Sequence, residues 1–406
     1  MALPISIPYT FANATTSIPL SQLDTDISTI YATVNGIGNG TVALSNVVIT
    51  GGIISNVSGL STSSIANGTS NVSIATANGS VTVATAGNTA MTVDTLQNAT
   101  VTGTLAMGSS FKRNRIINGN MQIWQRGTSL TAASYSYIAD RWAFGNFANT
   151  TVSQSTSVPT GFQYSQKVQR PSGATSITGI VALQTIESVN CYDLAGKSVT
   201  LSFYAKAGAN YSSASNNLTV QVWTGTVADQ GGSTYSSWTG AAQPINTTVT
   251  LTTTFQRFTV TGTIASNVLE MASVFSFTPV GTAGADDSFF ITGVQLEVGT
   301  IATPYEMQIY SDQISQCYRY CFVAPANWFY AYGGSGSAVV NFATSGYFPV
   351  PMRTTPTATG TIATSNCPTP SAAVLSAYMV SYNSYNSTVG ASAFGSAANY
   401  TFAAEL

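Results

Sequence analysis

Charge distribution limits what the first part of this chain can fold into more than any other feature. Residues 1–111 contain only three charged side chains, all acidic, and every Lys and Arg lies at or after Lys112. The three are Asp24, Asp26 and Asp94. An arm with so few charges lacks the surface of an ordinary water-facing domain. We therefore expect its structure to come from repetitive backbone pairing.

The composition of the whole chain excludes several classes of function. Its 406 residues carry 12 basic and 14 acidic side chains, a net charge of −2, so we expect no nucleic-acid binding through phosphate neutralisation. No run of about 18 apolar residues is present, and we expect no membrane insertion. The first residues lack the basic and apolar regions of a secretory signal, which favours a protein made in a cytoplasm and released by lysis.

Apolar residues near the start are spaced as in a short amphipathic helix. The residues on this seam are Leu20, Leu23, Ile27, Ile30 and Val34. Steps of three and four are typical of a coiled coil, and Ser21 with Asp24 resembles a capping box. Because two heptads are too short to be stable alone, we predict a trimeric helix bundle or docking on another protein. The alternative is a lone helix lying on its own chain.

Residues 36–110 consist of short β-branched runs separated by Gly, Asn and Ser. Three runs alternate with period two, at 72–74, 81–83 and 91–93, and Asn78-Gly79 is typical of a hairpin turn. No run is long enough to close a core by itself. We predict a repetitive β stem in which three copies wrap around one axis and bury their alternating apolar faces. Disorder is the alternative, given the polarity.

Between residues 111 and 301 the runs become longer and carry aromatic side chains. Four of them alternate clearly, at 199–205, 218–223, 255–260 and 289–296. Many strands, Gly-rich turns and hardly any helix are typical of a β-sandwich or jelly roll. The length suits one such domain.

Residues 302–406 predict a helix followed by a small distal β domain. Thr303 is placed to cap the helix, Pro304 suits its first turn and Glu306 completes a capping box. Apolar residues at helical spacing extend this helix over about 304–322. The molecule is thus expected to be mainly β. Its expected parts are 1–35, 36–110, 111–301 and 302–406.

Several phrases of the chain resemble those of phage tail fibres, and they occur in the order found in that family. In the second part of the chain they are NRIINGNMQIWQRG at 114–127, ADRW at 139–142, GVQLEVG at 293–299, ATPYE at 302–306, QCYRY at 316–320 and FPVPMRTTPT at 348–357. Near the start, IPYTF at 7–11 and LSQLD at 20–24 look like the virion-proximal end of podovirus-type fibres.

This resemblance implies an elongated homotrimer located in the virion. It also implies that 111–301 is a sandwich similar to carbohydrate-binding modules, and that 1–35 attaches to a tail hub, nozzle or adaptor protein. The residues expected to make this attachment are Phe11, Leu20, Leu23, Ile27 and Ile30. The other expected partner is a polysaccharide or other receptor on the host surface.

The candidate ligand-binding residues are aromatic, because a sugar packs its C–H face on a ring while its hydroxyls bond to amides and hydroxyls. They are Trp223, Tyr235 and Trp238, which flank a Gly/Ser/Thr-rich segment expected to form a loop, and Trp328, Tyr330 and Tyr332 in the distal part. For each of them the alternative is a place in the core or at the trimer interface. Trp124 and Trp142, inside the shared phrases, are assigned to structure.

The sequence shows no pattern of a reaction centre. It contains no histidine, which excludes histidine-based triads and histidine metal sites. The four cysteines, Cys191, Cys317, Cys321 and Cys367, are expected to be buried thiols. Asp140 and Arg141 are expected to form a buried ion pair, and Asp286 with Asp287 either to bind calcium or to lie in a solvated turn. We expect no catalytic residue, no metal site and no cofactor.

The sequence therefore predicts a structural, non-enzymatic tail fibre that binds host cells through residues 111–406. Two alternatives from other classes remain. A capsule-degrading tailspike, a glycan hydrolase or lyase, would need two carboxylates facing each other about 5–10 Å apart. A cellular surface adhesin would need an export signal or an anchor.

Overall fold

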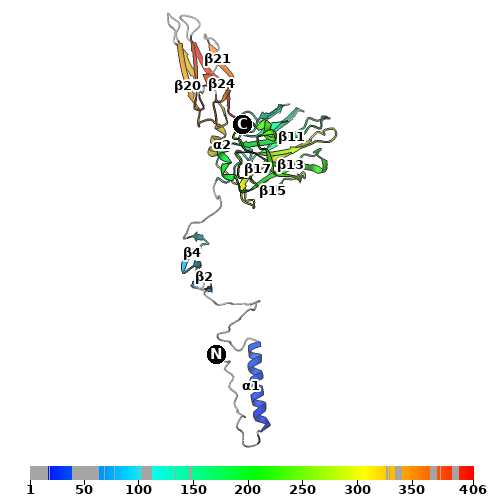
Figure 1. Ribbon diagram of the computed structural model, residues 1–406, viewed down its shortest axis with the longest axis vertical. Helices are drawn as coiled ribbons and strands as arrows, with labels where there is room; N and C mark the ends of the chain where they lie inside the picture. The colour runs from blue at the N-terminus through cyan, green and yellow to red at the C-terminus, as the bar shows by residue number, and fades with distance from the viewer. Residues whose placement is uncertain are drawn as a thin grey trace. The chain divides into compact units, whose positions relative to one another are not determined.

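The computed structural model is mainly β, with a helix near the start and several antiparallel sheets (Figure 1). It describes residues 17, 19–38, 64–67, 69–76, 78–97, 99–101, 112–132, 134–145, 149–325, 328, 330–333, 341–365, 373–374, 376–385 and 393–406. The chain divides into two compact units, Met1–Leu105 and Ala106–Leu406.

Helix α1 in the first unit spans Leu20–Gly38, where the heptad spacing predicts a helix. It begins one residue before Ser21, so Ser21 lies in its first turn and is not the N-cap. The seam is exposed in this single chain. The exposed fractions are 78% for Leu20, 44% for Leu23, 54% for Ile27 and 41% for Ile30. The apolar face of α1 is therefore not covered by the described part of its own chain.

The described part of the expected stem is a five-stranded antiparallel sheet in which each strand pairs with the next. Its strands are β1 (Ser64–Asn67), β2 (Ser70–Ile74), β3 (Val81–Thr85), β4 (Asn88–Val93) and β5 (Ala99–Val101). The turn before β3 contains Asn78 with φ +59, and the N–H of Gly79 donates to the carbonyl of Thr76 at 2.8 Å. Val72 and Ile74 of β2 stay about half exposed. This sheet does not bury its apolar side chains within the described residues of one chain.

Two six-stranded antiparallel sheets form a β-sandwich in the second unit, as the alternating runs predict. The first, called the β12 sheet, has the order β15 (Gln256–Thr263), β12 (Ser198–Ala207), β17 (Ser288–Val298), β10 (Ser165–Gln169), β9 (Thr150–Ser155) and β6 (Ser129–Ala132). The second, called the β13 sheet, has the order β14 (Ala242–Thr250), β13 (Asn217–Gly225), β16 (Glu270–Phe277), β11 (Ile180–Ile186), β8 (Ala143–Gly145) and β7 (Ser136–Tyr137).

The sandwich is held together by an apolar core drawn from both sheets. In β13, Leu218, Val220 and Val222 are fully buried, and the alternating residues between them are partly exposed on the outer face. The ring of Phe203 in β12 packs edge-on against Phe275 in β16, with centroids 4.8 Å apart. Short 3-10 turns lie in the connections, at Ser188–Asn190, Tyr192–Leu194, Ala214–Asn216 and Gly232–Ser237.

A smaller β domain follows helix α2 (Tyr310–Tyr318). One sheet contains β18 (Cys321–Val323), β24 (Ala393–Ala403), β19 (Tyr330–Gly333) and β21 (Thr357–Ser365), and the other β20 (Asn341–Tyr347), β23 (Met379–Tyr385) and β22 (Ala373–Val374). Its core contains the aromatic residues Phe322, Phe348 and Phe402. The paired strands β21 and β24 run side by side in Figure 1.

Helix α2 is shorter than expected, because Thr303 and Glu306 of the expected capping box form hydrogen bonds to other parts of the chain. Residues 304–309 are not helical, and the helix begins at Tyr310. The hydroxyl of Thr303 donates to Glu297 at 2.6 Å. The carboxylate of Glu306 accepts the backbone N–H groups of Lys112 and Asn114 at 2.6 and 3.0 Å. These long-range bonds tie the segment to the sandwich instead of to a helix.

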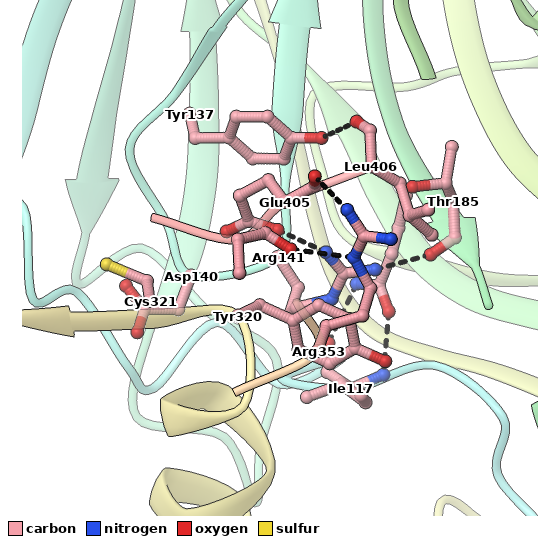
Figure 2. Close-up of polar contacts among 12 residues, drawn as sticks. Ile117, Tyr137, Asp140, Arg141, Thr185, Tyr320, Cys321, Arg353, Glu405 and Leu406 are labelled. Carbon is pink, nitrogen blue, oxygen red and sulfur yellow. Dashed lines mark hydrogen bonds and ion pairs between the residues drawn. The ribbon is translucent and has the colours of Figure 1, made fainter. Parts of the chain in front are cut away.

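Residues that follow β24 join the distal domain to the sandwich (Figure 2). The carboxylate of Glu405 pairs with Arg126 at 2.9 Å and with Arg141. The guanidinium of Arg141 also lies 3.6 Å from the ring centroid of Tyr320. Arg353 donates to the carbonyls of Ala404 and Glu405 at 2.7 and 2.8 Å. The two domains of this unit therefore share a buried ionic contact.

The expected pairing of Asp140 with Arg141 is wrong, although both side chains are buried. Arg141 pairs with Glu405, whereas the carboxylate of Asp140 accepts hydrogen bonds from Gln125 and lies 3.9 Å from Arg126. The two residues are neighbours in a turn, and Arg141 has a left-handed φ of +70. Their side chains consequently reach different partners.

Among the residues that the structure describes, no helix has both the length and the apolar character needed to cross a membrane.

Candidate functional site

The shared phrases 114–127 and 293–299 lie against each other and build a rigid frame. The side chain of Asn114 donates to the carbonyl of Val294 at 3.0 Å and accepts the N–H of Leu296 at 3.1 Å. The N–H of Val294 donates to the carbonyl of Gly119 at 2.9 Å. A Cβ at Gly119 would collide with the backbone of Val294. This close approach explains the glycine in the first phrase.

Asn118 fixes the loop that follows this contact. It is 2% exposed and has φ +55, a conformation that asparagine tolerates better than most residues. Its side-chain oxygen accepts the N–H groups of Gln122 and Ile123, and its nitrogen donates to the carbonyls of Ile123 and Asp140. Four hydrogen bonds from one buried amide hold residues 118–123 in a single conformation.

Two adjoining hollows open beside this loop, and we call them together the amide groove. One has a volume of about 410 Å³ and the other about 330 Å³, each within the range of about 300–1,000 Å³ typical of small-molecule sites. Both are lined by Gln122, Gln163 and Tyr310. The amides of the lining are Asn120, Gln122, Gln125, Gln154, Gln163 and Gln308, and its aromatic residues are Trp124, Phe162, Tyr164 and Tyr310.

Five segments supply these side chains. Residues 120–128 form one wall and the loop 161–164 before β10 forms another, while Gln154 comes from β9. Helix α2 and the extended segment before it add Tyr310, Ile314 and Gln308. Because residues 304–309 are not helical, they bring Met307 and Gln308 to the groove.

The amides of the groove form a weakly bonded chain. The side chain of Asn120 donates to Gln122 at 3.2 Å, Gln122 donates to Gln163 at 3.4 Å, and Gln163 donates to the hydroxyl of Tyr164 at 3.5 Å. Asn120 is 5% exposed, and its side-chain oxygen has no hydrogen-bond partner among the described residues. A buried amide oxygen without a partner is costly, so a donor from a bound molecule would be favoured here.

The chemistry of the groove suits a neutral, hydroxyl-rich ligand. None of the described residues that line it carries a formal charge. A carboxamide offers both a donor and an acceptor, which matches a sugar hydroxyl that does the same. Tyr310 is 57% exposed, and Trp124 is partly buried with its N–H donating to the carbonyl of Met121 at 2.6 Å. Their rings offer apolar faces for the C–H groups of a sugar ring.

The sequence does not single out these residues, because they do not form an aromatic cluster in one loop. Trp124 was assigned to structure, yet it lines the groove as well. Trp142 is fully buried in the sandwich core, as that assignment requires. A usable signal was present, since segment 118–128 concentrates amides around one tryptophan.

Trp223 and Tyr235, two of the predicted candidates, lie together on the outer face of the β13 sheet. Their ring centroids are 5.4 Å apart in an edge-to-face arrangement, and both rings are partly exposed. The indole N–H of Trp223 donates to Gln221 at 3.1 Å, and Gln221 donates to Asn246 at 3.1 Å. This pair remains a candidate platform for a sugar, on a different face from the amide groove.

Trp238 and Trp328 both pack against other residues, but they differ in burial. Trp238 is 3% exposed, and its N–H donates to the carbonyl of Gly231 at 3.0 Å. Trp328 packs in the distal core, with ring centroids 4.9 Å from Phe322 and 5.7 Å from Phe348. The buried ring of Trp238 is therefore not free to stack on a ligand, whereas Trp328 is only partly buried and stays a prediction.

The remaining predicted residues are placed only in part. Tyr330 and Tyr332 lie two residues apart in β19, which pairs with β24, and their side chains lie outside the described residues. Phe11 also lies outside the described residues. The other predicted attachment residues, Leu20, Leu23, Ile27 and Ile30, form the exposed seam of α1.

Asp286 and Asp287 face different cations, and the structure does not bring them together as a calcium site. Asp286 pairs with Lys167 at 2.8 Å. Asp287 is fully buried, pairs with Arg170 at 3.0 Å and accepts both the N–H and the hydroxyl of Ser212. Cys191, Cys317 and Cys321 are buried thiols, while Cys367 lies outside the described residues.

Comparison with known proteins finds likenesses among solved structures alone. No family model matches the chain, and no curated protein matches it. A carbohydrate-binding module of family 4 is 18% identical, with a TM-score of 0.29 over 45% of this chain and 99% of that one. TmCBM61 in complex with β-1,4-galactotriose is 12% identical, with a TM-score of 0.28 over 46% of this chain and 100% of that one.

The enzymatically active domain of tailspike protein 4 from bacteriophage CBA120 is also similar. It is 13% identical, with a TM-score of 0.27 over 46% of this chain and 21% of that one. TM-scores of this size say nothing about the ligand or the role of this chain.

Proposed function

We propose that this protein is a non-enzymatic, homotrimeric tail fibre of a bacteriophage that binds a glycan of the host surface in the amide groove. The N-terminal segment would attach to a tail hub, nozzle or adaptor protein, and residues 111–406 would contact the host. The phrases that the chain shares with tail fibres support this role, and the chemistry of the groove supports the ligand.

The single observation that carries the glycan proposal is the lining of the groove. Amide side chains and aromatic rings surround two adjoining hollows, without a charged residue among the described lining. The unpartnered oxygen of the buried Asn120 offers an acceptor for a ligand hydroxyl. Such a site would bind one sugar weakly, and three copies would raise the apparent affinity through effective concentration.

Exposed apolar surface in the first unit supports the trimer. The seam of α1 and the half-exposed residues of β2 need a partner, and heptad spacing suits identical copies of the same helix. Two further copies of this chain are therefore the proposed occupants of this surface. Docking of this seam on a tail protein is the alternative.

The test is binding of the full-length protein to an array of bacterial surface polysaccharides. Tyr310→Ala and Gln163→Ala remove exposed side chains of the groove, so the fold should be kept while binding weakens about tenfold, as the loss of a ring face or a hydrogen bond predicts. Tyr378→Ala and Gln256→Ala are matched controls at exposed positions elsewhere.

Binding that is equal in the groove variants and the controls would place the ligand elsewhere. Release of reducing sugar from a bound polysaccharide would favour a tailspike hydrolase over a non-enzymatic fibre. Binding to no polysaccharide would contradict the proposal.

A further inference from the structure

A third hollow lies next to the amide groove and differs from it in charge. It has a volume of about 300 Å³, and its lining includes three basic side chains, Lys112, Arg115 and Arg319. The chain has only 12 Lys and Arg in all, so a quarter of them meet at this one place. No carboxylate belongs to the described lining. We call it the basic hollow.

Gln308 connects the basic hollow to the amide groove, because it lines both. Its side-chain oxygen accepts a hydrogen bond from Gln316 at 3.2 Å. This bond fixes the carboxamide and leaves its nitrogen as a donor for a ligand. A chain-like ligand in the amide groove would therefore reach the basic hollow by passing one shared residue.

The cations of the basic hollow keep unused hydrogen-bonding capacity. Arg319 donates through Nε and one terminal nitrogen to Glu187, at 3.0 and 2.5 Å. Its guanidinium also lies 6.0 Å from the ring centroid of Tyr320. Arg115 pairs through one terminal nitrogen with Asp193 at 2.5 Å, and its buried Nε has no partner in the described part of the chain.

Lys112 supplies the third cation of the basic hollow. Its ammonium forms no ion pair with a described carboxylate, and the residue is exposed. The nearby carboxylate of Glu306 is held by the backbone N–H groups of Lys112 and Asn114. The carboxylates of Asp193, Glu187 and Glu306 together balance the charges of Lys112, Arg115 and Arg319. A monovalent carboxylate disturbs this balance less than a doubly charged phosphate does.

We infer that the basic hollow binds the carboxylate of an acidic sugar, such as a uronic acid, in the same glycan that occupies the amide groove. This inference rests on the proposed glycan-binding function and adds the class of sugar. The carboxylate would accept N–H groups from Arg115 and Arg319 and lie near Lys112, while Asn190 and Gln316 would meet the ring hydroxyls.

The test uses the full-length protein and polysaccharides printed in two forms, native and carboxyl-reduced. Carboxyl reduction turns each uronic acid into its neutral sugar and leaves the linkages unchanged. The native form of the bound polysaccharide should bind at least about tenfold more strongly than the reduced form, the usual size of one charge-assisted bond. Binding to the native form should also weaken as salt rises.

A variant that lacks one cation of the hollow distinguishes a local effect on binding from an effect of the protein's net charge. Lys112→Gln should weaken binding to the native polysaccharide about fivefold to tenfold and leave binding to the reduced form unchanged. Lys197→Gln, which removes an exposed cation outside the hollow, should change neither. Circular dichroism checks that both variants fold as the unmodified protein does.

The outcomes distinguish the two proposals. Equal binding to native and reduced forms, with loss in the Tyr310→Ala variant, would overturn the acidic-sugar inference and leave glycan binding in the groove intact. Equal losses in Lys112→Gln and Lys197→Gln would also overturn it, because the effect would be one of net charge. No binding to either form would overturn both.

Discussion

Single residues in the shared phrases 114–127 and 293–299 determine where the amide groove lies on the sandwich. Gly119 allows the two shared phrases to touch, and Asn118 holds the loop that carries Asn120 and Gln122. The phrases that were recognisable in the sequence are therefore scaffold residues in large part, and the groove is built on their edge.

Asn118→Ala tests this scaffold at the level of one side chain. The substitution leaves buried backbone groups of Gln122 and Ile123 unpaired and places alanine at a positive φ, so we expect a loss of about 2–4 kcal/mol in the free energy of unfolding. Denaturant titration measures it, with Asn246→Ala at an exposed strand position as the control. A loss of less than about 1 kcal/mol would show that Asn118 does not organise the loop.

The buried carboxyl group of Glu270 is expected to make the free energy of unfolding depend on pH. It is fully buried, with one oxygen accepting the N–H of Gln230 at 2.8 Å and the other without a partner among the described residues. Burial raises the pKa of Glu270 from 4.5 to about 7. The folded state then binds more protons than the unfolded state between these values, so stability falls as the pH rises through this window.

Glu270→Gln should remove most of that slope. Burial also raises the pKa of Asp140, to about 6, so the window from pH 6 to 7 reports mainly on Glu270. Urea unfolding of both proteins at several pH values in this window measures the effect. Parallel pH profiles for the variant and the unmodified protein would contradict this account of Glu270.

At the scale of elements, the strands could be predicted from the sequence better than the helix boundaries. Alternation placed β12, β13, β15 and β17 correctly, because one face of each strand packs in the core and imposes a period of two. Thr303 and Glu306 have the spacing of a capping box. In the structure they form hydrogen bonds to Glu297, Lys112 and Asn114 instead. Such bonds span up to 194 residues and leave no local pattern.

The site was harder to predict than the fold for the same reason. Its walls come from residues 120–128, 154, 161–164 and 307–314, which meet only after the sandwich forms. Trp223 and Tyr235 lie together because they belong to one strand and the loop that follows it. Trp238 lies in the same loop, but its ring is buried beneath it.

Helix α1 gives a test of assembly at the scale of one element. Ile27→Asn places an amide in the exposed apolar seam, which should weaken a trimeric bundle and lower the mass measured by light scattering from trimer toward monomer. Ser28→Asn, one residue away from the seam, is the matched control. An Ile27→Asn protein that stays trimeric at micromolar concentration would show that α1 does not hold the trimer together.

At the scale of the whole molecule, the second unit combines two domains through buried charges. Arg141 is 1% exposed, pairs with Glu405 and donates to the carbonyl of Thr185 at 2.6 Å. Removing one partner of a buried pair commonly costs about 3–5 kcal/mol, because the other charge stays buried. We therefore expect the sandwich and the distal domain to unfold together.

Arg141→Met should uncouple them. Calorimetry of the variant should show the distal domain melting in a separate, earlier transition, with the sandwich transition kept. A single transition at an unchanged temperature would mean that the apolar contacts alone join the two domains.

The proposed role of the molecule depends on where a glycan lies. The most direct measurement is the structure of the full-length protein bound to the polysaccharide that the array selects. Density for sugar rings in the amide groove, against Trp124 and Tyr310 and within hydrogen-bonding distance of the Asn120 oxygen, is the predicted result. Density on the outer face of the β13 sheet, against Trp223 and Tyr235 with the groove empty, would contradict it.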